Sequence, residues 1–214
     1  MTARLSMAGT GAVLLDVAHG AFDPAAQRRV WAAARALAAD PAVVQAVPGV
    51  NNLLVTFDAL RTDPDDVEQR VRACWQAASP EPVPARLVEI PVTYGGAFGE
   101  DLKLVAAHAG LSEDETIALH LAGEYSVAAI GAMPGFAYLT GLDPRLAIPR
   151  RDTPRLTVAR GAVMVGGGHA GVMPCTAPSG WHIIGRTDAV LFDAARAEPG
   201  LLRIGDRVRF TQAG

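Results

Sequence analysis

Lysine is almost absent from this 214-residue chain. Lys103 is the single lysine among 19 basic residues, which stand against 22 acidic ones, so the net charge is -3. A nucleic-acid binder needs a basic excess, so nucleic acid is not an expected partner. A phosphate-binding loop of the GxxxxGK[ST] type needs a lysine after its glycine, and Lys103 lies in the string DLKLV instead. The arginine excess has two interpretations, codon bias or chemistry.

Cysteines and long apolar runs are also scarce. Cys74 and Cys175 lie far apart in the chain, which indicates neither a disulfide framework nor a metal-ligand cluster. The five histidines show no HExxH motif and no zinc spacing, so we expect no metal site. The apolar run at 11–17 is short for a secretion signal, and Gly and Pro interrupt the other apolar stretches before the roughly 20 residues of a membrane helix. We therefore expect a cytoplasmic protein without a membrane partner.

The first part of the chain alternates strand and helix patterns. Asp23 and Asp63 each precede a proline, which predicts helices that begin there and run to about residues 40 and 78. The expected strands are 11–17, 42–47, 52–57 and 86–92. The order β-α-β-β-α-β is typical of a ferredoxin-like split βαβ domain, with two helices on one face of an antiparallel sheet. We expect this domain over residues 1–89.

From residue 90 onward the pattern changes. A short helix is expected over 99–109, and Ser112 with Glu115 forms a capping box that begins another, running to about residue 121. Short β-rich pieces separated by Gly and Pro then occur at 126–130, 156–160, 162–165, 182–185 and 207–210. They predict a compact antiparallel β barrel or sandwich over 90–214, and an α+β chain overall.

Arginines gather in the segment 131–160. Arg145, Arg150, Arg151, Arg155 and Arg160 lie in this Pro- and Gly-rich stretch, with Asp143 and Asp152 as the acidic residues near them. Arginine forks bind carboxylate or phosphate through paired hydrogen bonds, so the segment is either an anion-binding loop or a solvated one.

Three other features have competing interpretations. The string GGGHAG at 166–171 matches GxGxxG, but prolines follow where the phosphate-binding helix would begin, so we reject a dinucleotide site. His120 is either a helix-end residue bonding terminal carbonyls or a ligand contact. Cys175 lies in a Pro-rich turn with no identifiable base, which favours a structural thiol over a nucleophile.

Four ordered motifs resemble one family. They are IPVTYGGAFGEDL at 90–102, H-x4-Y-x-V at 120–127, GAMPGFAYLTGLDPRLAIPRRDTPR at 131–155 and PSGWHIIGRT at 178–187. The family, of carboxyltransferase domain subdomain C type, includes the B subunit of prokaryotic ATP-dependent 5-oxoprolinase, allophanate hydrolase subunit 1, the carboxyltransferase part of urea carboxylase and a sporulation histidine-kinase inhibitor. The chain departs from the family pattern at Ala132, Met173 and Ser179, where an aromatic residue, Tyr and Gly are usual.

The resemblance implies a fold and an activity. The fold is a ferredoxin-like domain followed by a cyclophilin-like β barrel. The activity is that of one component of a heteromeric 5-oxoprolinase, in which ATP with Mg phosphorylates the amide oxygen of 5-oxo-L-proline and the activated ring is hydrolysed to L-glutamate. The implied partners are a second barrel subunit (the C subunit of 5-oxoprolinase or allophanate hydrolase subunit 2) together with the A subunit of 5-oxoprolinase. We expect the chain to be inactive alone.

The resemblance also implies roles for individual residues. Cations and backbone amides would hold a carboxylate, a phosphate or a developing oxyanion, with the amides supplied by the turn 133–136. The expected catalytic residues are His120, Tyr138 and Arg155, and the expected binding residues are Met133, Gly135, Phe136, Arg150, Arg151, Trp181 and Arg186.

Three alternatives stay open at this point. The first is the carboxyltransferase component of a biotin-dependent urea carboxylase or allophanate hydrolase system; biotin would come from another domain, because Lys103 between two leucines does not resemble a biotinylation site. The second is a non-enzymatic histidine-kinase inhibitor. The third is a prolyl isomerase, which the barrel alone does not establish, since a fold does not confer a function.

Overall fold

The computed structural model describes residues 3–18, 20, 22–81 and 85–213, and the chain divides into two compact units, 1–84 and 85–214. None of the described helices combines the length and the apolar character that crossing a bilayer requires.

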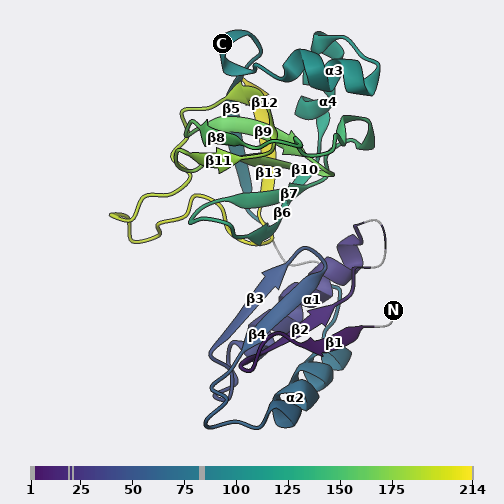
Figure 1. Ribbon diagram of the computed structural model, residues 1–214, viewed down its shortest axis with the longest axis vertical. Helices are drawn as coiled ribbons and strands as arrows, with labels where there is room; N and C mark the ends of the chain where they lie inside the picture. Colours follow the sequence, from purple (N-terminus) through teal and green to yellow (C-terminus); the bar gives the residue numbers. More distant parts are fainter. Residues whose placement is uncertain (1–2, 19, 21, 82–84, 214) are drawn as a thin grey trace. The chain divides into compact units, whose positions relative to one another are not determined.

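The first unit is a four-stranded antiparallel sheet with two helices (Figure 1). Its elements are β1 (Arg4–Met7), β2 (Ala12–Asp16), α1 (Pro24–Leu37), β3 (Gln45–Gly49), β4 (Asn52–Thr56) and α2 (Pro64–Ala77). Alternate residues of β2 and β4 are buried in one cluster with the apolar residues of both helices. Because alternate residues of a strand share one face, both helices cover the same side of the sheet, as expected.

Both helices begin at the residues that the sequence indicates. The Asp23 carboxylate accepts hydrogen bonds from the amides of Ala25 and Ala26, and Asp63 accepts one from Asp65. Each helix then has proline in its first turn, where the missing N–H costs nothing. The two predicted helix starts are confirmed.

The strand order of the first unit corrects the expected one. The sheet order is β1-β2-β4-β3, and its outer strand next to β2 comes from the start of the chain. The segment expected as the last strand forms β5 (Leu87–Tyr94), which belongs to the second unit. Ile90 and Val92 point into the core of that unit and are fully buried. The boundary between the two units therefore lies before β5, and the expected boundary between residues 89 and 90 would cut through this strand.

The second unit contains a closed barrel of seven strands in the order β10-β7-β6-β13-β5-β12-β9 (Figure 1). Its barrel strands are β5, β6 (Tyr125–Ile130), β7 (Ala137–Thr140), β9 (Ala162–Gly166), β10 (His169–Val172), β12 (His182–Arg186) and β13 (Arg207–Gln212). A separate hairpin is formed by β8 (Arg155–Val158) and β11 (Ala177–Ser179). The α+β class and the barrel are confirmed. The pairing is not antiparallel throughout, because β5 and β13 run parallel.

Four short helical elements complete the unit. They are η1 (Gly96–Phe98), α3 (Leu102–Ala109), α4 (Glu113–Ala122) and η2 (Pro144–Leu146). The capping box at the start of α4 is present, with Ser112 and Glu115 bonded to each other's backbone amides. The sequence does not predict β7, β10 or β11, since each is short and lies in a Gly- or Pro-rich stretch.

Two apolar clusters stabilise this unit. The larger fills the barrel and includes Tyr125, Leu139 and Phe210. The smaller contains Phe136, Met164, Met173 and Trp181, with Val158 contributed by β8. The candidate functional residues gather at this second cluster.

Candidate functional site

Three aromatic rings meet at the smaller cluster. Phe136 precedes β7, Tyr138 lies on it, and Trp181 directly precedes β12. The ring centroids of Phe136 and Tyr138 are 5.1 Å apart, those of Phe136 and Trp181 are 5.5 Å apart, and the rings cross at 81° and 80°. Such edge-to-face contacts favour a fixed ring arrangement. Segments that are distant in the sequence thus form one aromatic wall.

The glycine string 166–171 explains how Trp181 fits. A Cβ on Gly166 would lie 2.7 Å from Cγ of Trp181, and one on Gly171 would lie 3.1 Å from Cζ of Phe136. Glycine at these positions therefore lets the rings pack onto the backbone of β9 and β10. The string has a packing role here, consistent with the rejection of a dinucleotide site.

A cavity of about 250 Å³ opens beside the three rings. We call it the aromatic cavity. Its lining residues are Ala132, Met133, Phe136, Tyr138, Arg150, Arg151, Pro154, Met173, Pro178, Ser179, Gly180 and Trp181. Six of the residues expected from the sequence are therefore brought together, and the three departures from the family pattern lie at the same place.

The departures change the wall of the aromatic cavity in definite ways. Met173 is fully buried, so it supplies apolar surface without a hydroxyl. Ser179 adds a side-chain oxygen, which accepts a hydrogen bond from the Trp181 amide at 3.2 Å. Ala132 is exposed and has a φ of +63°, a conformation that a residue with a Cβ seldom adopts. Backbone strain of this kind clusters at functional sites.

The turn at 131–136 uses most of its own amides. The Met133 amide donates to Gly131 and the Phe136 amide donates to Met133, at 2.8 and 3.1 Å. These two amides are therefore engaged and do not serve as the expected oxyanion donors. Gly135 has a φ of +82°, and a Cβ there would lie 2.7 Å from Cβ of Phe192, so the turn requires glycine.

Two arginines contribute positive charge to the aromatic cavity. The Arg150 guanidinium lies 5.6 Å from the ring centroid of Trp181, a cation–π contact on an exposed side chain. Arg151 is partly buried, and its amide donates to Gly180 at 2.8 Å. Burial first, and then the charge of Arg150, lower the pKa of the neighbouring His169. His169 is thus held neutral, and the arginines set the local charge.

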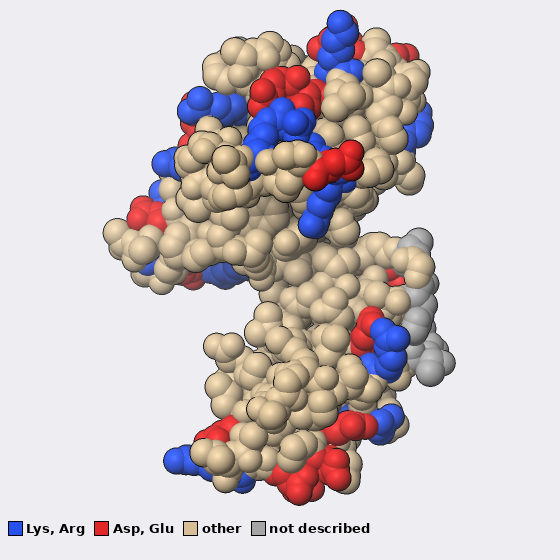
Figure 2. Space-filling view, in the orientation of Figure 1, with Lys and Arg blue, Asp and Glu red and all other residues tan. Residues whose placement is uncertain are grey.

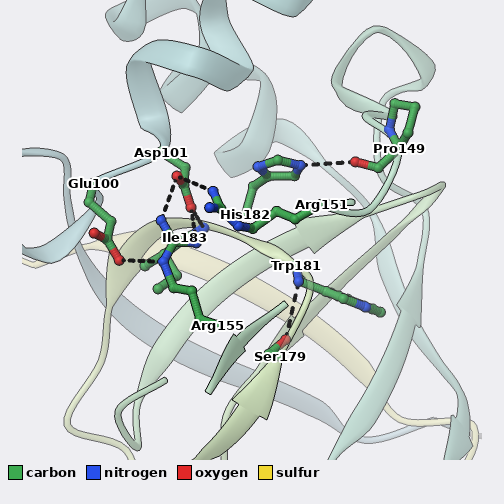
Figure 3. Close-up of polar contacts among 9 residues, drawn as sticks. All are labelled: Glu100, Asp101, Pro149, Arg151, Arg155, Ser179, Trp181, His182 and Ile183. Atoms are coloured by element: carbon green, nitrogen blue, oxygen red, sulfur yellow. Dashed lines mark hydrogen bonds and ion pairs between the residues drawn. The ribbon is translucent and has the colours of Figure 1, made fainter. Parts of the chain in front are cut away.

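A buried carboxylate, Asp101, organises the arginines (Figure 3). Arg155 donates from Nη1 and Nη2 to its two oxygens at 2.9 and 2.8 Å, and the Ile183 amide donates to Oδ2 at 2.8 Å. Arg151 Nη1 lies 3.5 Å from Oδ1. Burial by itself raises the pKa of Asp101, but the hydrogen bonds from Arg155 and from the Ile183 amide, with the charges of Arg155 and His182, outweigh it and hold the pKa below its ordinary value.

Arg155 is occupied by this network. Its Nε lies 3.1 Å from Glu100 Oε1, while Nη1 and Nη2 hold Asp101. The paired carboxylate raises the pKa of Arg155 further, and the side chain does not line the aromatic cavity. The structure therefore places Arg155 in ion pairs with Asp101 and Glu100, outside the lining of the aromatic cavity.

His120 lies in the barrel core, apart from the aromatic cavity. It is fully buried, its Nδ1 lies 2.7 Å from the Tyr94 hydroxyl oxygen, and its ring is 4.5 Å from that of Phe210. Burial lowers its pKa to about 3, so the ring is neutral at pH 7. His120 does not line the aromatic cavity, so the geometry does not support the expected catalytic role there.

Arg186 faces a different hollow. Its guanidinium lies 5.7 Å from the ring centroid of Phe98, above a trough of about 520 Å³ that shares no lining residue with the aromatic cavity. Asp188 lines the same trough, so one positive and one negative charge are found there.

The remaining loop arginines have separate surroundings. Arg145 forms a bidentate pair with Asp143, at 3.0 and 2.8 Å. Arg160 is exposed. The five-arginine cluster expected from the sequence is thus divided, and Arg150 and Arg151 are the two that line the aromatic cavity.

Comparison with known proteins assigns the family. The family model described as "Carboxyltransferase domain, subdomain C and D" matches residues 3–202. The chain belongs to this family. Two relatives extend the match: the chain is 44% identical over 208 residues to the 5-oxoprolinase B subunit of Escherichia coli, covering 97% of this chain and 95% of that protein. It is 37% identical to the 5-oxoprolinase B subunit of Bacillus subtilis, covering 80% and 76%.

A solved structure confirms the fold. The urea amidolyase of Kluyveromyces lactis superposes on 99% of this chain with a TM-score of 0.86 at 18% identity. This chain corresponds to only 15% of that protein, so the likeness concerns the fold alone.

Proposed function

We propose that this carboxyltransferase family member is one component of a heteromeric, ATP-dependent 5-oxoprolinase that opens 5-oxo-L-proline to L-glutamate. The observation that carries the proposal is the match to proteins named as the B subunit of 5-oxoprolinase, in one case along nearly the full length of both chains. The aromatic cavity is the proposed binding site for 5-oxoproline.

The chemistry of the aromatic cavity suits a small cyclic carboxylate. Flat apolar walls from Phe136 and Trp181 complement the faces of a five-membered ring, and a volume of about 250 Å³ accommodates a molecule of that size. Arg150 and Arg151 complement the carboxylate, since charge-assisted hydrogen bonds from arginine are among the strongest available to a protein. Tyr138 is half-buried in the same wall, and its hydroxyl is the proposed hydrogen-bond donor to the substrate.

ATP with Mg²⁺ would supply the phosphoryl group that activates the lactam. No site for it is recognisable among the residues that the structure describes. The single lysine, Lys103, is exposed on α3, and no group of three His, Cys, Asp or Glu side chains in the described residues is placed to hold a metal. We therefore assign substrate binding and orientation to this chain, and ATP to the assembled complex.

The proposed partners are the A subunit of 5-oxoprolinase together with a second barrel subunit. The names of the relatives, which designate one lettered component of an enzyme, imply a complex of several chains. Lys103 lies between two leucines, so we do not propose that biotin is attached to this chain.

Reconstitution tests the proposal. The chain is combined with its two partner subunits, and glutamate release from 5-oxoproline is measured with and without ATP. We expect release only with ATP and only when this chain is present. A complex that responds to urea and a biotin carrier, but not to 5-oxoproline, would replace the proposal with a urea carboxylase role.

A further inference from the structure

Asp101 is the residue of this region that the sequence does not single out. It directly precedes α3, its side chain is 7% exposed, and it contacts three separate segments: Arg155 on β8, Arg151 in the preceding loop and the Ile183 amide on β12 (Figure 3). Of these contacts, Arg151 lines the aromatic cavity, and Arg155 directly follows its lining residue Pro154 in the chain. We infer that Asp101 is a positioning residue, which orients Arg151 toward the carboxylate of the substrate.

Arg151 is held by few contacts of its own. Its Nη1 lies 3.5 Å from Asp101 Oδ1, a long ion pair, while its buried Nε has no hydrogen-bond partner among the described residues. A flexible arginine side chain that is left unheld loses conformational entropy when a ligand fixes it. The charge of Asp101 therefore supplies the preorganisation that Arg151 would otherwise lack.

Arg155 and Asp101 divide their roles. Arg155 neutralises Asp101 through two hydrogen bonds and is itself saturated by Glu100. Asp101 is thereby kept charged in a buried place, as its lowered pKa indicates. Glu100 and Asp101 balance the two guanidinium charges in number, but Arg155 makes the short contacts with both carboxylates and leaves Arg151 with one long contact of 3.5 Å. The positive charge of Arg151 is therefore only weakly compensated. It remains available to an anionic ligand, together with Arg150, which also lines the aromatic cavity.

The consequence for binding rests on the proposed function, but the positioning of Arg151 does not. The first measurement is the ¹⁵N–¹H NOE of the Arg151 Nε group in the full chain, assigned from the signal that disappears in Arg151→Lys. We expect an ordered signal in the wild type and a mobile one in Asp101→Asn. The matched control is Asp143→Asn, which removes the carboxylate paired with Arg145 in the same loop and leaves Arg151 ordered. An Arg151 signal that stays ordered in Asp101→Asn overturns the inference.

The second measurement is kinetic, in the assembled complex. Asp101→Asn is expected to raise the KM for 5-oxoproline about tenfold with a smaller change in kcat, the scale of a weakened charge-assisted hydrogen bond. In an Arg151→Ala background the same substitution should add nothing, because Asp101 acts through Arg151. Inhibition by pyrrolidinone, which has the ring without the carboxylate, should not change. Additive effects of the two substitutions contradict the inference.

A double variant controls for the case in which Asp101→Asn alone unfolds the chain. Asp101→Asn/Arg155→Gln removes both members of the buried pair and keeps two amides able to bond each other. It should show the same mobile Arg151 signal and the same rise in KM. If the wild-type complex does not turn over 5-oxoproline at all, the proposed function fails, while the NOE still decides the role of Asp101.

Discussion

At the scale of single side chains, burial and hydrogen-bond partners determine which candidate residues are available to a ligand. Arg150 and Arg151 line the aromatic cavity. Arg155 instead pairs with Asp101, and His120 is packed against aromatic rings in the barrel core. The sequence indicates that the arginines of a proline-rich loop form either an anion-binding loop or a solvated one. It does not show which arginines line a cavity and which pair with Asp101, because Asp101 comes from a distant segment of the chain. The one sequence signal for Asp101 is its place in the motif at 90–102.

His120 makes the fold sensitive to acid. Its pKa is about 3 in the folded chain and 6.5 when unperturbed, so below pH 6.5 the unfolded chain binds the extra proton and stability falls as the pH falls. We expect a loss of about 1.4 kcal/mol per pH unit from this group down to pH 3, and none above pH 6.5. Urea unfolding at several pH values measures it. His120→Gln should show a shallower pH dependence, and an unchanged slope would contradict the assignment.

Arg155 is expected to stabilise the fold through its ion pair with the buried Asp101. Arg155→Ala leaves the buried Asp101 carboxylate with a weakened set of partners, and removing one partner of a buried pair costs about 3 kcal/mol. We expect a lower free energy of unfolding by urea titration. Arg145→Ala is the control, since that pair is exposed and should change stability little. Equal stability of Arg155→Ala and wild type would show that Asp101 does not depend on Arg155.

Secondary structure is predictable at the scale of elements where its cause is local. The starts of α1, α2 and α4 follow from Asp23, Asp63 and Ser112, whose side chains bond the first amides of each helix. Strand partners are not local. The alternation of β5 predicts a strand, but only the fold reveals that it pairs with β13 in the barrel.

Gly166, the last residue of β9, is predicted to shape the aromatic cavity. Gly166→Ala would place a Cβ 2.7 Å from Cγ of Trp181, so the indole must move. We expect a destabilisation of about 1–3 kcal/mol, typical of overpacking, with altered tryptophan fluorescence and a raised KM. Gly168→Ala is the matched control, because its Cβ would meet nothing within 4 Å. Identical spectra and KM for the two variants would disprove the packing role of Gly166.

At the scale of the whole molecule, each of the two units has its own apolar core. On the face drawn in Figure 2, acidic and basic side chains stand next to one another, in keeping with ion pairs such as Arg145 with Asp143. The composition predicts the low net charge and the resemblance predicts the barrel, because both depend on the chain as a whole. The placement of β1 and β5 depends on which strands close each sheet, and local patterns do not encode it.

Exposed apolar side chains are the expected contacts with partner subunits. Leu156 on β8 is 86% exposed, although it belongs to a hairpin beside the aromatic cavity. We expect Leu156→Glu to leave the thermal stability of the isolated chain unchanged and to weaken its co-purification with the second barrel subunit. Leu60→Glu is the comparison in the first unit, where Leu60 is 97% exposed. If Leu156→Glu co-purifies with the second barrel subunit as well as the wild type does, the surface around Leu156 is not part of the contact with that subunit.

The KM for 5-oxoproline of Arg150→Gln in the reconstituted complex is the most direct test of carboxylate binding in the aromatic cavity. Arg150 lines that cavity and stacks on Trp181, whereas Arg145 in the same loop is paired with Asp143. Loss of one charge-assisted hydrogen bond should raise the KM about tenfold in Arg150→Gln, while Arg145→Gln keeps the wild-type value. Equal KM values for wild type, Arg150→Gln and Arg145→Gln would contradict binding of the substrate at this site.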